Sequence, residues 1–302
     1  MTVSPSEVPA AARAFLNGAI DYAGLFPPAE LAMPSAAAHY LAYRSGPDAW
    51  ALGRFVVPAA RLGELAECLT APGHIRGNPL PVSALVGAGS LAAAAAIETF
   101  NRQEAVHGAR VAVVEAKAES VGAVRESLAA FPAGFLRYVE IPIAEGNGPL
   151  LDAVQAGAGF AKLRTGGVTA DGFPAPESLL LTLRALAQRK LPFKATAGLH
   201  HPLRGLFPLT YAPDAPAAMM YGHVNILLAA TILWTRGGSD QAQEALLEES
   251  PASLCFEDDA LVWRDLRFDA ITLEAVRADF FHGFGSCSFR EPLDLLPLAG
   301  VR

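Results

Sequence analysis

Two lysines in similar surroundings are the residues of this sequence best suited to chemistry. Lys162 and Lys194 lie 32 residues apart, each near the end of a short apolar segment that leads into a glycine-containing turn. An amine attacks a carbonyl carbon only after it loses its proton, and both burial and a neighbouring cation favour the neutral form. The pattern therefore predicts a lysine nucleophile with a second lysine beside it. The simpler interpretation is a lysine that extends its charge to solvent at the rim of a sheet.

Groups that could assist such a lysine lie nearby in the sequence. Glu140 ends the segment Tyr-Val-Glu, and its carboxylate could move protons at the carbon next to a carbonyl. Arg164 is followed by Thr165, Gly166 and Gly167. A guanidinium offers a bidentate fork to a carboxylate or phosphate, so this segment is predicted to bind an anionic substrate.

The adjacent histidines His200 and His201 form a further candidate. On a strand they would point in opposite directions, so only one could serve a shared site. Either could act as a general acid or base together with Glu140, or as a metal ligand, whereas the plainer interpretation is a backbone contact or a solvated ring. The sequence has none of the usual zinc, phosphate-loop or dinucleotide spacings, so we expect no metal and no organic cofactor.

Five more polar residues lie at predicted strand or helix ends and are predicted to contact substrate: Asp21, Tyr22, His223, Asn225 and Ser286. Asp21 and Tyr22 could instead belong to a tight turn, and Asn225 could simply satisfy the backbone at the start of an apolar helix. Residues 283–287 are rich in glycine, so their backbone amides could cradle an anion. Cys287 has no base assigned to it, and a buried, inert thiol is its more common role.

The two lysine segments together resemble a known family. The stretch 160–167 (FAKLRTGG), a helix, and the stretch 193–199 (FKATAGL) resemble strands six and seven of class I, Schiff-base aldolases of the deoxyribose-phosphate aldolase type. The resemblance covers residues 159–200. It implies that Lys162 forms the Schiff base and that Lys194 favours its neutral form. Glu115 or Glu140 would replace the family's strand-four aspartate, and Arg164 stands where the family has a small hydroxyl residue.

The elements that must position these residues alternate between strands and helices. Seven segments read as strands, with centres about 23 to 32 residues apart, which is typical of a (β/α)8 TIM-like barrel: 19–26, 52–57, 81–86, 109–115, 136–143, 159–164 and 191–196. The eighth strand is ambiguous, because either a hairpin within 252–269 or residues 284–289 could close the barrel. A doubly wound open sheet is the alternative, although the segment 87–89 (GAG) lacks the third glycine of a dinucleotide fingerprint, since position 92 is Ala.

Composition narrows the class of protein. The 302 residues carry 23 Lys and Arg against 30 Asp and Glu, a net charge of −7, without a basic run that would suit nucleic acid. The N-terminal segment lacks a signal pattern, and three cysteines are present, so the sequence favours a cytoplasmic protein. The apolar runs 91–97 and 226–234 are too short to cross a membrane and are predicted to be buried helices.

These features predict a single barrel domain over residues 1–302, with a C-terminal hairpin, helix and glycine-rich turn at about 250–302. The favoured function is a lyase, aldolase-like, acting on a small anionic carbonyl metabolite through a lysine imine. A hydrolase or isomerase that uses histidine and glutamate is the alternative enzyme. A ligand-binding barrel without catalytic activity is the third hypothesis, and a homo-oligomer is compatible with all three.

Overall fold

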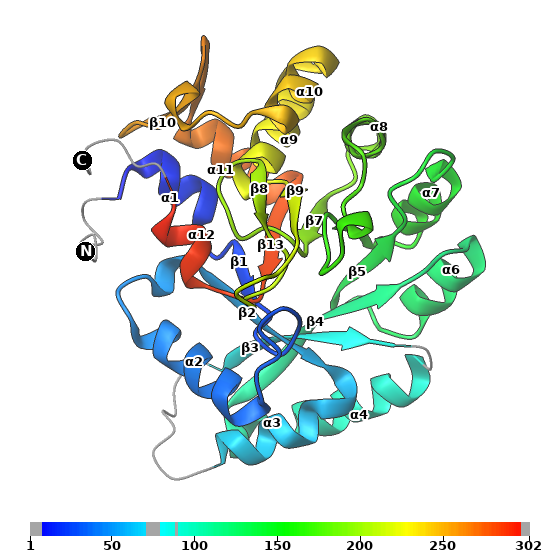
Figure 1. Cartoon of the computed structure of the whole chain (residues 1–302). Coiled ribbons are helices and arrows are strands. Elements are labelled where there is room, and N and C mark those ends of the chain that lie inside the picture. Colours follow the sequence, from blue (N-terminus) through cyan, green and yellow to red (C-terminus); the bar gives the residue numbers. More distant parts are fainter. Residues whose placement is uncertain (1–7, 71–78, 88–89, 297–302) are drawn as a thin grey trace.

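The computed structural model describes residues 8–70, 79–87 and 90–296. Eight parallel strands form a closed barrel, with helices on its outside (Figure 1). This confirms the predicted TIM-like barrel and excludes the open sheet. The N-terminal segment 1–7 and residues 88–89 of the glycine pattern lie outside the described residues.

The barrel strands follow the predicted segments closely. They are β1 (Ile20–Tyr22), β2 (Leu52–Pro58), β3 (Leu80–Val86), β4 (Ala109–Lys117), β5 (Leu136–Ile141), β6 (Phe160–Arg164), β7 (Phe193–Thr196) and β13 (Phe281–Ser286). They are hydrogen-bonded in the order β1-β13-β7-β6-β5-β4-β3-β2, and β2 returns to β1.

One α-helix precedes the first strand, and the other described α-helices lie between the strands or after the last of them. They are α1 (Ala10–Leu16), α2 (Met33–Ser45), α3 (Leu62–Leu69), α4 (Ser90–Arg102), α5 (Glu104–His107), α6 (Val121–Ala129), α7 (Gly148–Ala156), α8 (Pro176–Arg189), α9 (His223–Arg236), α10 (Ser239–Leu247), α11 (Ala270–Asp279) and α12 (Arg290–Asp294). Short 3-10 turns occupy 49–51, 59–61, 170–172 and 251–253.

The eighth barrel strand is β13, which pairs with both β7 and β1. The alternative segment, 252–269, forms a separate antiparallel sheet of β10 (Leu254–Phe256), β11 (Ala260–Trp263) and β12 (Leu266–Asp269). Most of the glycine-rich stretch 283–287 is therefore strand, and the prediction of a flexible anion-binding turn there is wrong. A further hairpin, β8 (Gly205–Pro208) with β9 (Ala217–Met220), follows β7.

The described helices include none that is long and apolar enough to cross a membrane. The run 226–234 lies in α9, where residues 223–233 are all buried, as predicted. The run 91–97 lies in α4, but Ala95 and Ala96 are exposed and Ile97 is buried. The prediction of a buried helix was therefore wrong for α4, since only one face of α4 meets the protein.

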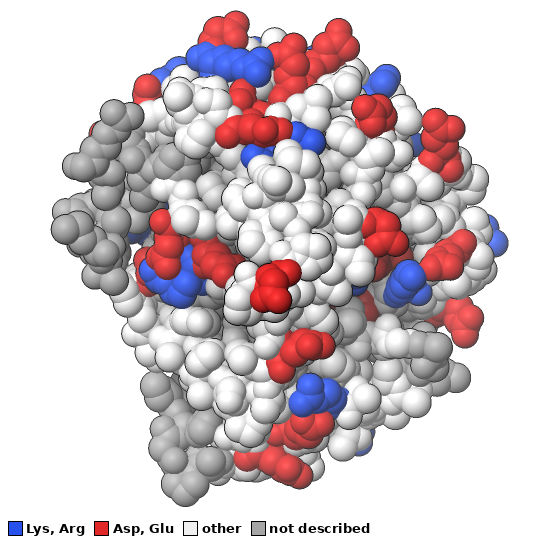
Figure 2. All heavy atoms as spheres, in the orientation of Figure 1, with Lys and Arg blue, Asp and Glu red and all other residues white. Residues whose placement is uncertain are grey.

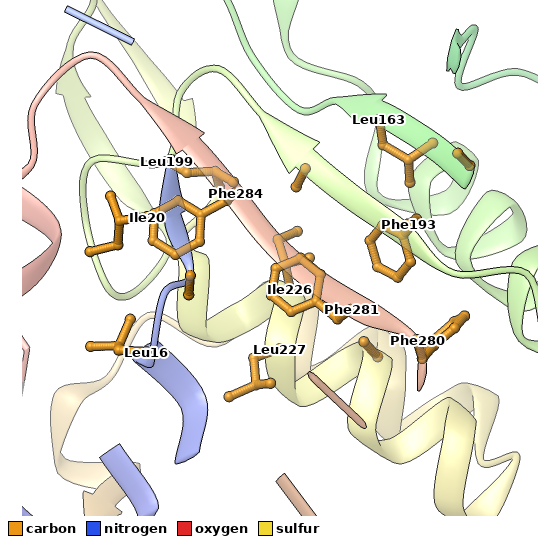
Figure 3. Close-up of a cluster of buried hydrophobic side chains, with 14 of the residues drawn as sticks. Leu16, Ile20, Leu163, Phe193, Leu199, Ile226, Leu227, Phe280, Phe281 and Phe284 are labelled. Atoms are coloured by element: carbon orange, nitrogen blue, oxygen red, sulfur yellow. The ribbon is translucent and has the colours of Figure 1, made fainter. Parts of the chain in front are cut away.

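The apolar core fills the space between the strands and the helices that cover them. Figure 3 shows aromatic rings from β13 and β7 packed over α9, with Phe193, Phe281 and Phe284 beside Ile226 and Leu227. These five side chains have no exposed surface. Because this packing joins three elements far apart in the sequence, it holds the end of β13 rigidly beside the end of β7.

Charged side chains of both signs are scattered over the face shown in Figure 2, with acidic side chains near its middle and uncharged surface between them. This face has no large patch of one sign. Five buried charged residues lie on the barrel strands: Asp21, Glu115, Glu140, Lys162 and Lys194.

Candidate active site

A cavity of about 660 Å³ lies at the carboxyl ends of the barrel strands. Glu115 reaches it from β4, Lys162 from β6 and Lys194 from β7, and His200 and Cys287 line it from the segments that follow β7 and β13. Active sites of this fold lie at this face of the barrel, because the strand ends and their loops converge there. The cavity is the candidate active site.

Glu115 connects the two lysines. Its Oε2 lies 2.8 Å from the Nζ of Lys162, and its Oε1 lies 2.7 Å from the Nζ of Lys194. All three residues are at most 3% exposed. Ser83 on β3 donates a hydrogen bond of 2.6 Å to the same Oε1. One carboxylate therefore receives three donors and fixes both ammonium groups.

Each lysine has a second carboxylate partner. Lys162 Nζ lies 3.0 Å from Glu140 Oε2, and Lys194 Nζ lies 2.5 Å from Asp21 Oδ2. Glu140 in turn accepts a hydrogen bond of 2.9 Å from the Nε of Arg164, whose side chain is 52% exposed. We call these six residues, Asp21, Glu115, Glu140, Lys162, Arg164 and Lys194, the ionic cluster.

Strand register explains why the ionic cluster forms. Glu140 of β5 is in register with Lys162 of β6, which is in register with Lys194 of β7. Alternate side chains of a strand point to the same face, so Lys162 points into the barrel, Leu163 packs against the helices, and Arg164 lies at the rim. Because Lys162 and Lys194 are in register on neighbouring strands, their side chains lie on the same face of the sheet.

The electrostatics differ from the expected ones. Burial opposes charge on Lys194, but Asp21 and Glu115 outweigh burial and raise its pKa above the ordinary lysine range. Burial likewise opposes the Glu115 carboxylate, but Lys162 and Lys194 hold its pKa well below the usual range. The expected surroundings of the lysines were an apolar strand and neighbouring cations, and three carboxylates lie among them as well.

Glu140 also remains ionised. Burial would raise its pKa, but Lys162 and Arg164 lower it below the ordinary value. Glu140 contacts Lys162 without being one of the cavity-lining residues, whereas Glu115 lines the cavity. The sequence indicated Glu115 only as a possible substitute for an aspartate, although its position at the end of β4 was already a signal.

The turns after β6 and β7 are packed together. Thr165 Oγ1 donates hydrogen bonds to the carbonyl oxygens of Thr196 and Ala197. A Cβ on Gly166 would lie 3.0 Å from Gly198 Cα, so the two turns touch through glycines. Thr165 and Gly166 thus hold the strand ends together, and of the predicted anion-binding segment only Arg164 and Gly167 line the cavity.

Both histidines of the adjacent pair line the cavity. They follow a bend in which Ala197 and Gly198 have positive φ angles, so the strand geometry that would separate them does not apply. His201 stacks on Phe207 with ring centroids 3.5 Å apart, and burial followed by the charge of His200 lowers its pKa. The expectation that only one histidine could face the site is wrong.

His200 is held by a carboxylate other than Glu140. Its Nδ1 lies 2.6 Å from Glu291 Oε2, and its Nε2 faces Cys287 Sγ at 3.8 Å. Burial opposes the charged imidazole, but the hydrogen bonds with Cys287 and Glu291 outweigh burial and raise the pKa of His200 to about 9. Neither Glu291 nor Tyr211, whose hydroxyl lies 3.6 Å from Cys287 Sγ, was identified from the sequence.

Of the three predicted contact residues Asp21, Tyr22 and Ser286, only Ser286 lines the cavity. Asp21 accepts a hydrogen bond from the backbone amide of Arg54 and pairs with Lys194, so it is a counter-ion rather than a cavity-lining residue. The ring of Tyr22 stacks on Phe55 and is buried away from the cavity. Ser286 does line the cavity, and its Oγ accepts a hydrogen bond from the amide of Ser288.

The start of α9 is structural. Asn225 Oδ1 accepts from the amides of Arg204 and Gly222, and its Nδ2 donates to the carbonyl oxygens of Ala245 and Glu248. His223 has no exposed surface and stacks on the rings of Phe15 and Phe284.

Burial lowers the pKa of His223 to about 3, so the ring is neutral at pH 7. Neither His223 nor Asn225 lines the cavity. The prediction that they contact substrate is not supported by this arrangement. Asn225 is bonded to the backbone of neighbouring segments, and His223 packs among aromatic rings with its Nε2 3.2 Å from the carbonyl oxygen of Pro292.

Within residues 8–70, 79–87 and 90–296, no group of three or more His, Cys, Asp or Glu side chains is arranged to hold a metal ion. The carboxylates of the ionic cluster instead face ammonium and guanidinium groups, which occupy the positions that a cation would take.

Comparisons with known proteins identify no family for this chain. No protein-family model and no curated protein matches the chain. One similar solved structure is named a "putative lyase/mutase" from Burkholderia cenocepacia J2315. It is 16% identical, covers 77% of this chain and 90% of its own, and has a TM-score of 0.38.

Proposed function

We propose that the protein is an enzyme, a lyase of the aldolase type, that forms an imine between Lys162 and a small anionic carbonyl compound. The observation that carries this proposal is Glu115, which lies between the Nζ atoms of Lys162 and Lys194 at the floor of the cavity. It matches the strand-four carboxylate that the resemblance to class I aldolases implies. It also provides a proton path between the two amines.

The arrangement divides the roles of the lysines. Lys194 has its pKa raised by two carboxylates, so it remains an ammonium group and can act as an acid. Lys162 is the nucleophile, because its second carboxylate, Glu140, is itself neutralised by Arg164. Lys194 therefore serves as a proton donor, which replaces the role of a cation that only repels the charge of Lys162.

Each step of imine formation has a group in place. Lys162 passes a proton to Glu115 Oε2, and its free amine attacks the carbonyl carbon, forming the C–N bond as the C=O π bond opens. Lys194 donates a proton to the oxygen and is recharged through Glu115 Oε1. The nitrogen of the adduct gives its extra proton to Glu115, and a second proton reaches the hydroxyl group through Lys194. The oxygen then leaves as water while the nitrogen lone pair forms the protonated imine.

The imine then acts as an electron sink. When the bond between the carbons α and β to the imine carbon breaks, its electron pair moves into the enamine. A carboxylate takes the proton of the β-hydroxyl group, which becomes the carbonyl group of the departing fragment. Glu115 lines the cavity and is the nearest base to Lys162 that does so. Glu140 does not line the cavity but pairs with the same lysine. Arg164 at the rim provides the positive charge for an anionic substituent.

Borohydride trapping tests the proposal. The protein is incubated with a panel of small aldehydes and keto acids, reduced, digested and mapped by mass spectrometry. We expect a secondary amine on Lys162 and its absence in Lys162→Met. Lys117→Met is the matched control, because Lys117 is an exposed lysine on β4 whose side chain is 66% exposed. Equal labelling of Lys117 and Lys162 across the whole panel would contradict the proposal.

A further inference from the structure

The cavity holds a second reactive cluster on the wall formed by the segments after β7 and β13. Cys287 Sγ lies 3.8 Å from His200 Nε2, and His200 Nδ1 lies 2.6 Å from Glu291 Oε2. The hydroxyl of Tyr211 lies 3.6 Å from the same sulfur. All four residues line the cavity. We call them the thiol cluster.

The order of these contacts is that of an activated nucleophile. A thiol becomes reactive when a histidine takes its proton, and a carboxylate on the other ring nitrogen orients the histidine and stabilises its charge. Cys287 is 7% exposed, and this small exposed area faces the cavity. The raised pKa of His200 agrees with an imidazolium held between the Cys287 sulfur and the Glu291 carboxylate.

The alternative is a buried thiol that only fills space. Such a cysteine needs apolar neighbours, and Cys287 instead has an imidazole and a phenol within sulfur hydrogen-bond distance. Cys68 and Cys255, the other two free cysteines, have no comparable contact among the hydrogen bonds of the described residues. Cys68 and Cys255 can therefore serve as reference thiols for the reactivity of Cys287.

We propose that Cys287 is a second catalytic nucleophile of the cavity, which adds to an electrophilic carbonyl carbon while His200 handles the proton. The S–C bond forms as the C=O π bond opens. With an aldehyde the oxygen takes the proton from His200, and the product is a thiohemiacetal. With an ester or thioester the oxygen keeps its negative charge, and the C=O π bond re-forms as the bond to the leaving group breaks. The leaving group departs with the proton from His200, and a thioester remains on Cys287 for water to hydrolyse.

Tyr211 completes the arrangement. Burial, followed by the nearby Cys287 and Glu291, raises the pKa of its phenol, so the hydroxyl remains protonated and can donate to the developing oxyanion. Tyr211 lies between β8 and β9, on a segment separate from those of His200 and Cys287. Three connections thus contribute one group each, and Glu291 of α12 supplies the fourth.

Alkylation with iodoacetamide tests the proposal without knowledge of the substrate. At pH 7 an ordinary thiol is only a few per cent thiolate, so a paired thiolate should react about tenfold faster once its lower intrinsic nucleophilicity is counted. We expect Cys287 to be alkylated about tenfold faster than Cys68 and Cys255 at pH 7, as measured by peptide mapping. His200→Gln should remove this advantage, and Glu291→Gln should reduce it.

Aldehyde capture and acyl transfer are distinguished in the Lys162→Met protein. In this variant an imine on residue 162 cannot form and shield Cys287 from the reagents. Propanal should slow alkylation of Cys287 reversibly if aldehydes are captured, and 4-nitrophenyl acetate should leave an acetyl group on Cys287 if acyl groups are transferred. A rate for Cys287 no greater than that of Cys68, or an unchanged rate in a His200→Gln protein with native circular dichroism, would overturn the proposal. So would the absence of both carbonyl adducts.

Discussion

The ionic cluster and the thiol cluster share one cavity but are built in different ways. The ionic cluster comes from barrel strands, and its two lysines and Glu115 are almost fully buried and paired on every side. The thiol cluster comes from the segments that follow strands, and Glu291 is about one third exposed. We therefore expect the ionic cluster to stabilise the folded protein strongly. Substitutions in the thiol cluster should lower the free energy of unfolding by less.

The largest expected effect belongs to Glu115. Glu115→Gln keeps the shape of the side chain but leaves two buried ammonium groups with one carboxylate fewer. Breaking a buried ion pair from one side costs about 3 to 5 kcal/mol, so we expect a loss of that size in the free energy of unfolding. Urea denaturation followed by circular dichroism measures it.

Glu98→Gln is the matched control for Glu115→Gln. Glu98 pairs with Arg102 on the surface of α4, and both side chains are more than half exposed. Its loss should change stability by about 0.5 kcal/mol or less. Equal effects of the two substitutions would show that the ionic cluster does not stabilise the barrel.

The thiol cluster should give a smaller effect that depends on pH. The folded pKa of His200 is about 9, above the ordinary value of 6.5, so its stabilisation is complete below pH 6.5 and is lost as pH rises through 9. Two and a half pH units correspond to about 3 kcal/mol, which partial exposure of the pair reduces to about 2.

The measurement is the free energy of unfolding at pH 6 and pH 10 in the natural protein and in His200→Gln. The difference between the two proteins should shrink at pH 10 by about 2 kcal/mol. A difference independent of pH would mean that His200 is not charged in the folded protein, and the contrast between the clusters would lose its electrostatic basis.

The smallest effect belongs to Arg164, which lies at the rim of the ionic cluster. Arg164→Lys keeps the charge but loses the fork that already engages Glu140 with its Nε. We expect the yield of borohydride trapping with pyruvate to fall about fivefold, the equivalent of about 1 kcal/mol, and the yield with propanal to remain unchanged. A parallel fall for both compounds would remove Arg164 from anion binding.

The lysines of the ionic cluster could be predicted from the sequence, because alternation and strand spacing are patterns of neighbouring residues. Alternation along a strand predicted that Lys162 and Arg164 share one face, and the strand spacing placed Lys194 on the next strand. The bridging role of Glu115 needed the register of β4 against β5 and β6, which no local pattern contains. The sequence therefore predicted the lysines but not what separates them.

The thiol cluster and the start of α9 could not be predicted in the same way. His200 meets Cys287 and Glu291 across 87 and 91 residues, and only closure of the barrel by β13 brings them together. His223 and Asn225 looked equally functional in the sequence, since a polar residue at the start of an apolar helix suits either role. Their partners, such as Pro292 and Ala245, are supplied by distant backbone.

The central claim is that Lys162 attacks while Lys194 donates the proton. The most direct test is borohydride trapping with a reactive aldehyde or keto acid, mapped at each pH from 6 to 10 in the natural protein and in Lys194→Met. Without Lys194, the carboxylates of Glu115 and Asp21 lose a counter-ion and hold the charge on Lys162 more strongly.

We therefore predict an adduct on Lys162 in both proteins, with the pH of half-maximal trapping shifted to the alkaline side in Lys194→Met. An adduct on Lys194 in the natural protein, or full carbon–carbon cleavage by Lys162→Met, would contradict the account.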